Sequence, residues 1–232
     1  MKECFLPTDN VNRFDDLCME MEDRRSLIGP SMAIVTGPAG RGKSESAKRY
    51  AVNTEAVYIP PMIKTSAMML LQEITLDLAK MRPGRIAGCL EVIQEEMARR
   101  RRLVIIDEAD LIPLSLLEML RNINERYACP ILLIGEDGLK GKIAQRKRIS
   151  SRIRRRMEFE PVTQPNIVLF FRKALEMNVN SGITQLIHRH CEGDWRPVLK
   201  IAGDIERAVE ASGLREIPEE LVRDIIDEDR KR

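Results

Sequence analysis

A glycine-rich loop between an apolar run and a helical pattern is the feature that most constrains the fold. Residues 34–51 have the sequence IVTGPAGRGKSESAKRYA, in which apolar residues give way to glycines, a lysine and serines and then return at helical spacing. Residues 37–44, GPAGRGKS, fit the pattern GxxxxGK[ST] with a predicted strand before and a helix after. Such a loop curls backbone N–H groups around phosphate oxygens at the positive end of the helix. The segment therefore predicts a nucleoside triphosphate site; a chance glycine-rich turn is the alternative.

The chemistry of the loop assigns two roles. Lys43 is expected to reach the β and γ phosphates, and the hydroxyl of Ser44 is expected to hold Mg²⁺. The predicted nucleotide-binding residues of this loop are Gly37, Pro38, Ala39, Gly40, Arg41, Gly42, Lys43, Ser44 and Glu45.

A second motif, RLVIIDEAD at residues 102–110, ends an apolar strand on two acids. Asp107 is predicted to support the metal and its bound water, and Glu108 to polarise an attacking water. Acids at the end of a buried strand are costly unless they are used. GTPases position water with a glutamine instead, and the guanine-reading NKxD pattern does not occur. ATP is therefore the predicted nucleotide, with Mg²⁺ as its metal.

Short apolar runs alternate with helical patterns over the first two thirds of the chain, which predicts an α/β fold with a parallel five-stranded sheet flanked by helices. The expected strands are residues 32–37, 56–60, 102–107, 130–135 and 157–162. The expected helices between them are residues 43–52, 65–80, 113–126 and 139–153. After Pro161 only helical patterns follow, so the chain is predicted to divide into an α/β domain, 1–162, and a helical lid domain, 163–232.

Composition places the chain among ordinary soluble proteins, with 44% apolar and 32% charged residues. No apolar run approaches the roughly 20 residues needed to span a bilayer. The five cysteines are scattered, which suits a reducing compartment and buried small side chains. We expect a cytoplasmic protein with no membrane partner.

Charge is concentrated in one segment. Residues 140–156 carry nine lysines and arginines and no acid, although the whole chain has a net charge of only +2. This segment is a candidate anion-binding face.

The order of these motifs resembles the AAA+ ATPases, with a Walker A loop at 37–44, a Walker B strand at 103–108 and an all-α lid. Within them, IVTGPAGRGKS, LVIIDEADLI, PILLIGEDGL and SSRIRRRMEF resemble the branch that holds the transposition ATPases MuB, TniB and TnsC, which ExeA-like secretion ATPases share. The resemblance implies an ATP-dependent DNA-binding regulator that assembles on DNA, marks a target site and activates a transposase.

The same resemblance assigns roles to individual residues. It makes Lys43 and Ser44 the phosphate and metal positions, Asp107 the metal carboxylate and Glu108 the catalytic base. The sensor-1 position falls on Glu136, where the superfamily usually has a neutral polar residue, and this departure puts water positioning in question.

An arginine finger, which completes a neighbouring subunit's site, is expected just before the fifth strand. Arg152 is the first candidate and Arg148 the second, although either could be a solvated or DNA-facing charge. In the lid, Asp194 suits a helix N-cap and Arg196 matches the sensor-2 position, with simple capping and surface charge as the alternative.

Double-stranded DNA is the implied partner, gripped through its phosphates rather than read at its bases. Because the P-loop begins at residue 37, we expect the ATPase core to make these contacts. Thr65 and Ser66 could equally cap the following helix. The predicted DNA-binding residues are Lys64, Thr65, Lys140, Lys142, Arg146 and Lys147.

Other functions remain open at this point. The chain could be an ExeA-like ATPase that energises a secretion or membrane assembly, or a nucleotide-gated module with little turnover. The favoured interpretation includes a homo-oligomer, either a helical filament or a ring, that forms with ATP. His188, His190 and Cys191 lie on one short helical stretch without a suitably spaced fourth ligand, so no zinc is expected.

Overall fold

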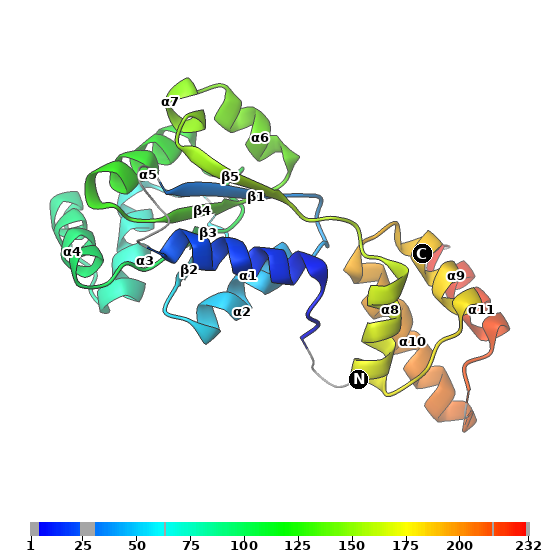
Figure 1. Cartoon of the computed structure of the whole chain (residues 1–232). Coiled ribbons are helices and arrows are strands. Elements are labelled where there is room, and N and C mark those ends of the chain that lie inside the picture. Colours follow the sequence, from blue (N-terminus) through cyan, green and yellow to red (C-terminus); the bar gives the residue numbers. More distant parts are fainter. Residues whose placement is uncertain (1–4, 24–30, 63, 215, 231–232) are drawn as a thin grey trace. The chain divides into compact units, whose positions relative to one another are not determined.

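The computed structural model describes residues 5–23, 31–62, 64–214 and 216–230, and they form two compact units (Figure 1). The α/β unit consists of Asn12–Pro38 and Lys43–Phe159. The helical unit comprises the described residues up to Val11, the loop segment Ala39–Gly42 and the described residues from Glu160 onward. The two units divide at Phe159 and Glu160, whereas the sequence put the boundary between residues 162 and 163; as a division into domains, that boundary stays a prediction.

The α/β unit is built on a five-stranded sheet with the order β2-β3-β4-β1-β5, in which every neighbouring pair is parallel. The predicted fold class is confirmed. The strands are β1 Met32–Thr36, β2 Val57–Ile59, β3 Val104–Ile106, β4 Ile131–Ile134 and β5 Ile153–Glu158. The helices of this unit are α1 Asp9–Glu22 from Asn12 onward, α2 Lys43–Asn53, α3 Ala67–Ala79, α4 Ile86–Arg99, α5 Leu114–Tyr127, α6 Asp137–Ala144 and α7 Lys147–Ser150.

The alternation of strand side chains divides the core into two layers. Met32 and Ile34 of β1 face a cluster with apolar residues of α3 to α7, whereas Ala33 and Val35 face a second cluster with α1 and α2 (Figure 1). Both faces of the central strands are therefore covered, as a parallel sheet requires. The carboxyl ends of β1, β3 and β4 then share one edge of the sheet.

The single helix expected over residues 139–153 is wrong. The segment forms α6, α7 and the start of β5, which begins at Ile153 and pairs with β1. The pattern misled because β5 is an edge strand: Arg154 to Arg156 are exposed, so the apolar signal of a strand is missing and only the charged run remains. The helices α1 and α4 were not among the expected elements.

The helical unit contains α8 Gln164–Phe170, a π-helix η1 Phe171–Leu175, α9 Ser181–Cys191, α10 Trp195–Ser212 and α11 Glu219–Arg230. Its core holds Ile167, Phe171, Ile187, Ile201 and Val222, all fully buried or nearly so. No helix among the described residues combines the length and apolar character that crossing a bilayer requires. The cysteines Cys18, Cys89, Cys129 and Cys191 are buried and free, and Cys4 lies outside the described residues.

Candidate active site

The glycine-rich loop joins β1 to α2 as the sequence predicts. Gly37, Gly40 and Gly42 have φ values of +146°, +73° and +95°, in the region that side chains other than glycine rarely adopt. Helix α2 begins at Lys43, which puts Ser44 in its first turn. The Lys43 ammonium folds back along the loop and donates to the carbonyl oxygens of Gly37 and Pro38, each at 2.7 Å. The loop thus presents backbone, a lysine and a helix N-terminus together, which fits the phosphates of a nucleotide.

Asp107 follows β3 at the same edge of the sheet and is 3% exposed. One carboxylate oxygen, Oδ1, accepts the N–H of Glu108 at 2.9 Å, and the other, Oδ2, accepts the Tyr58 hydroxyl at 2.7 Å. Each oxygen keeps a lone pair that can accept a metal-bound water. A hydroxyl in Ser44 and a carboxylate in Asp107 are oxygen donors of the kind that Mg²⁺ prefers, so the residues present fit that ion.

Glu108 turns sharply out of the strand. Its φ of +47° is left-handed, which is uncommon and strained for a side chain of this kind. This conformation directs its N–H onto Asp107 and leaves its own carboxyl group exposed at the sheet edge.

Carboxylates surround Glu108. Burial and then the charges of Asp107, Asp110 and Glu136 raise the pKa of Glu108, and Lys43 acts in the opposite direction.

The Asp110 carboxylate accepts the N–H of Glu136 at 3.2 Å, and this bond connects the end of β4 to the turn after β3. Glu136 lies where the sequence placed it, at the end of β4, but it adds negative charge to the site. Its role in positioning water stays a prediction.

The tip of the glycine-rich loop, Ala39–Gly42, packs within the helical unit. Trp195 donates its backbone N–H to the Gly40 carbonyl at 2.9 Å, and the Arg41 guanidinium donates to the Glu192 carbonyl at 3.0 Å. Glycine is required at residue 193, where φ is +79° and a Cβ would lie 1.9 Å from Arg41 Nη1. Arg41 was predicted only as a nucleotide-binding residue, and the sequence carried no signal for this contact with the lid turn.

Two residues of the helical unit, Asp194 and Arg196, were given roles in the sequence analysis. Asp194 caps α10 by accepting the N–H of Arg196 at 2.7 Å, as expected. The Arg196 side chain is exposed. Its predicted sensor-2 role stays a prediction.

The candidate DNA-binding loop has one exposed cation. Lys64 is exposed in a left-handed backbone conformation with φ +53°. Thr65 is buried, and its hydroxyl donates to the Met62 carbonyl at 3.0 Å, while Ser66 caps α3 by accepting from Met69. The alternative of a capping role is therefore confirmed for Ser66 but not for Thr65, whose hydroxyl closes the preceding turn.

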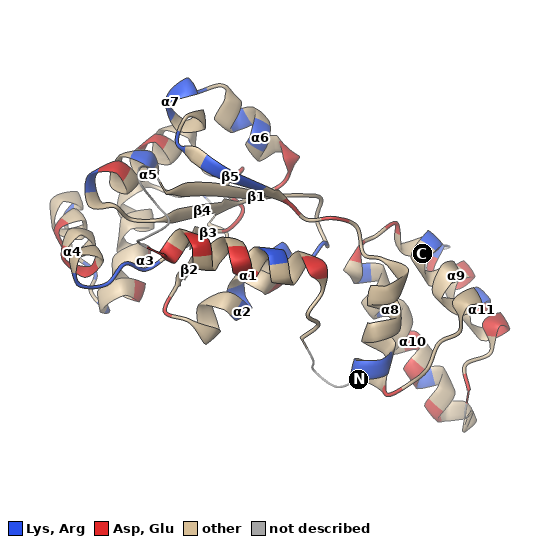
Figure 2. Cartoon of the chain, viewed as in Figure 1, with Lys and Arg blue, Asp and Glu red and all other residues tan. Residues whose placement is uncertain are grey.

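The cations of the 140–156 segment lie along α6, α7 and β5 (Figure 2), and most of them contact groups of their own unit. Lys140 pairs with Asp137 and Glu158, at 3.0 and 2.7 Å, and Arg146 lies 3.5 Å from Glu118. Lys142 donates to the carbonyl oxygens of Asp110 and Ile112, at 2.5 and 2.6 Å, and so supports the turn after β3. Arg155 pairs with Glu20. The segment is thus less free to bind an external anion than its sequence indicates.

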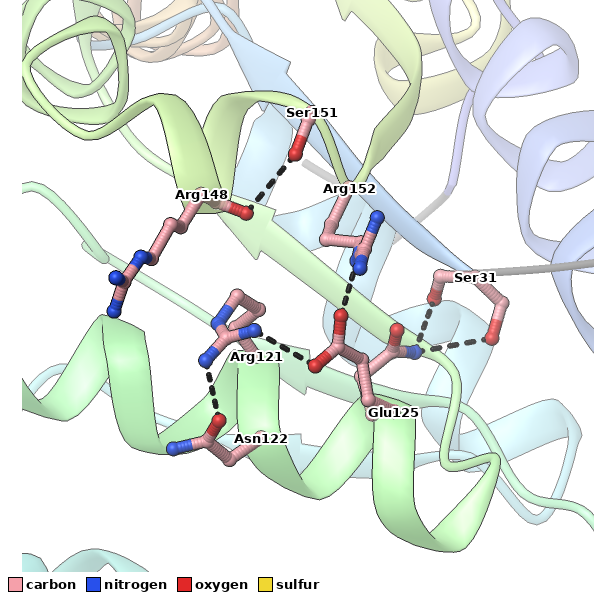
Figure 3. Close-up of polar contacts among 8 residues, drawn as sticks. Ser31, Arg121, Asn122, Glu125, Arg148, Ser151 and Arg152 are labelled. Atoms are coloured by element: carbon pink, nitrogen blue, oxygen red, sulfur yellow. Dashed lines mark hydrogen bonds and ion pairs between the residues drawn. The ribbon is translucent and has the colours of Figure 1, made fainter.

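The two arginine-finger candidates differ in their contacts (Figure 3). Arg152 forms an ion pair with Glu125 of α5, and Arg121 donates to the same carboxylate at 2.7 Å. These arginines lower the pKa of Glu125, chiefly through the hydrogen bond from Arg152. The Arg148 guanidinium points away from this cluster and has no ion pair among the described residues, whereas its backbone carbonyl accepts the Ser151 hydroxyl.

Tyr58 is a site residue that the sequence analysis did not single out. Burial, and then the hydrogen bond to Asp107, raise the pKa of its hydroxyl well above the usual value for a tyrosine. The sequence feature that could have indicated it is a single hydroxyl-bearing residue in the otherwise apolar run AVYIP. The strand formed by this run lies beside the strand that ends at the acidic pair.

Comparison with known proteins identifies the family. Residues 27–143, which include the glycine-rich loop and both acids, match a family model described as an AAA domain. The chain belongs to the AAA domain family. The predicted resemblance to the AAA+ ATPases of the MuB branch is confirmed by the relatives that follow.

Two relatives are similar over about half of this chain. The Mu-like prophage FluMu DNA transposition protein B of Haemophilus influenzae is 30% identical over 113 residues, 47% of this chain and 39% of that protein. The ATP-dependent target DNA activator B of Escherichia phage Mu is 30% identical over 115 residues, 48% of this chain and 37% of that protein. The matched stretch thus spans less than two fifths of each relative.

Solved structures agree on the fold. Cdc6p from Pyrobaculum aerophilum has a TM-score of 0.72 at 18% identity, over 97% of this chain and 68% of that one. The Aeropyrum pernix ORC1 protein in complex with DNA has a TM-score of 0.63 at 19% identity, over 97% and 66%. The RuvB Holliday junction branch migration motor of Thermotoga maritima has a TM-score of 0.61 at 16% identity, over 96% and 70%. At these identities the likeness concerns the fold alone.

Proposed function

We propose that this protein is an ATP-dependent DNA-binding ATPase that assembles on duplex DNA, marks a target site and activates a transposase. One observation carries the proposal: the stretch that is 30% identical to the DNA activator of phage Mu belongs to a chain in which Lys43 ends a glycine-rich loop after β1 and Asp107 and Glu108 follow β3 at the same edge of the sheet. The names of both relatives support the DNA and transposition part of this function.

Hydrolysis uses groups of the α/β unit. Lys43 would exchange its two loop carbonyls for the β and γ phosphates, and Ser44 and Asp107 would hold Mg²⁺, which would neutralise phosphate charge. Glu108 accepts the proton of the attacking water.

Assembly of subunits would supply one further positive charge, an arginine that reaches the γ phosphate of a neighbouring subunit. Arg148 is a better candidate than Arg152 for the residue that reaches a neighbouring subunit's γ phosphate, because Arg152 is already paired with Glu125. A finger must extend from its own subunit, and the Arg148 guanidinium, which has no ion pair with any described residue, can do so without breaking one.

DNA binding rests on exposed cations that have no strong partner among the residues the structure describes. Lys64 and Lys147 meet this condition better than Lys140 and Lys142, whose ammonium groups contact acids or carbonyls. Lys64→Ala should weaken binding to all duplex sequences alike and reduce the slope of log affinity against log salt by about 1. Lys48→Ala, which removes an exposed lysine paired within its own helix, is the matched control.

The deciding experiment is steady-state ATP hydrolysis with and without duplex DNA, for the parent protein and Glu108→Gln. The proposal expects DNA-stimulated turnover in the parent and ATP-dependent DNA binding without turnover in the variant. An ATP turnover rate that is the same with and without DNA, together with a DNA affinity that does not depend on ATP, would contradict the proposal.

A nucleotide-gated DNA-binding module with little turnover is the second candidate function. The acidic environment of Glu136 and Glu108 favours it, because added negative charge opposes the approach of a phosphate and its water. ATP-dependent DNA binding by a parent protein with negligible turnover would select this function.

A further inference from the structure

We propose that Tyr58 is a positioning residue that orients the Asp107 carboxylate for Mg²⁺, through the hydrogen bond between its hydroxyl and Asp107 Oδ2. This inference rests on the proposed nucleotide site and adds a residue to it. Tyr58 lies on β2, whose contribution to the site comes from this side chain and from a backbone carbonyl.

The sheet register brings the two residues together. Tyr58 pairs with Ile105 in the parallel ladder between β2 and β3, and both belong to the layer that faces α1 and α2. Asp107 comes two residues after Ile105, so its side chain leaves the same face one step farther along. A tyrosine is long enough to cover that step, and its hydroxyl lies 2.7 Å from Oδ2.

The backbone of Asp107 is fixed from the same strand. Its N–H donates to the Ile59 carbonyl at 3.0 Å, directly beside Tyr58. The strand β2 therefore holds both the main chain and the side chain of Asp107.

The carboxylate has one donor on each oxygen. Glu108 N–H occupies one lone pair of Oδ1 and the Tyr58 hydroxyl occupies one lone pair of Oδ2. Two donors at opposite ends of a carboxylate prevent rotation about the Cβ–Cγ bond, and the lone pairs that remain face a defined direction. Partners of this kind orient a metal's ligands, and their removal typically lowers metal affinity by about 10- to 100-fold.

A purely structural role of the Tyr58 hydroxyl predicts a different effect on nucleotide binding. If the hydroxyl only anchored the short edge strand β2, its removal would lower thermal stability and weaken nucleotide binding equally with and without metal. An orienting role instead weakens only the part of the binding that depends on Mg²⁺.

Tyr58→Phe removes the hydroxyl and keeps the ring, and ATP affinity is measured by calorimetry in Mg²⁺ and in EDTA. We expect the gain in affinity on adding Mg²⁺ to fall by about 10-fold, with affinity in EDTA unchanged. Tyr50→Phe is the matched control, because the Tyr50 hydroxyl also donates to a carboxylate, that of Glu22, at 2.7 Å. It should leave both affinities at the parent values.

A double-mutant cycle with Asp107→Asn separates the two roles even if Tyr58→Phe loses stability. The loss of Mg²⁺-dependent affinity on removing the hydroxyl should vanish in the Asp107→Asn background, since Tyr58 acts through that carboxylate. An equal loss in both backgrounds, or a Tyr58→Phe protein with the parent's Mg²⁺ dependence, overturns the proposal. Absence of ATP binding by the parent in Mg²⁺ would instead refute the proposed function.

Discussion

The contrast between Arg148 and Arg152 allows stability and assembly to be separated by two alanine substitutions. Arg152 and Glu125 are 39% and 29% exposed, so solvent screens their ion pair and limits its contribution to about 0.5–1 kcal/mol. Arg152→Ala should therefore lower the melting temperature by about 1–4 °C for a chain of this size. Arg148→Ala should not change it, because the bond from Ser151 to the residue 148 carbonyl survives the substitution.

The effects on ATP turnover should be the reverse of the effects on melting temperature, with the larger loss in Arg148→Ala. An arginine that completes a neighbour's site is worth about 10³-fold or more in turnover, or about 4 kcal/mol of activation barrier. We expect Arg148→Ala to bind ATP but to lose DNA-stimulated hydrolysis by that factor, while Arg152→Ala keeps turnover within about threefold of the parent.

The assay is steady-state ATP hydrolysis on duplex DNA over a range of protein concentrations, with thermal melting of each variant. Lys147→Ala is the control, since it removes the neighbouring cation of α7 and should affect DNA affinity rather than turnover at saturating DNA. Parent-like turnover in Arg148→Ala combined with a large loss in Arg152→Ala would refute the reasoning, and would mean that Arg152 leaves Glu125 when subunits assemble.

Three further outcomes are expected. Lys43→Ala should abolish ATP binding in calorimetry and lower the free energy of unfolding by about 1–3 kcal/mol, because the ammonium also donates to two loop carbonyls. The fluorescence of Trp195, the one tryptophan of the sequence, should change on saturation with ATP and not in Lys43→Ala, since the backbone N–H of this residue donates to the loop tip. The third outcome is a pH effect. Lys200, and then His190, lower the pKa of Asp229, so this carboxylate contributes stability that is present above its ordinary pKa of 3.8 and is lost as pH falls through the lower folded-state value. Thermal melts of Asp229→Asn should lose that acid-side dependence.

The sequence determined the glycine-rich loop and the succession of strands along the chain because those features are local. Gly37 and Gly42 mark backbone angles that the loop requires, and Asp107 ends an apolar run long enough to be a buried strand. Both motifs depend on residues within a few positions of each other. The helices of the lid were equally visible, since their period and their caps, such as Asp194, lie within single segments.

The tertiary structure decided which charged and polar groups are available. The hydroxyl of Tyr58 reaches Asp107 across 49 residues of sequence because β2 and β3 pair in register. Arg155 is paired with Glu20 across 135 residues, which no inspection of the basic run could reveal.

The same distinction separates Arg148 from Arg152. They are four residues apart in one charged segment and are equivalent in sequence terms, but only Arg152 lies beside an acid of α5. The sequence of a segment gives only the number of cations that it carries. Which of them remain free is set by acids that the fold brings from distant segments, because an ion pair depends on distance in space and not on distance along the chain.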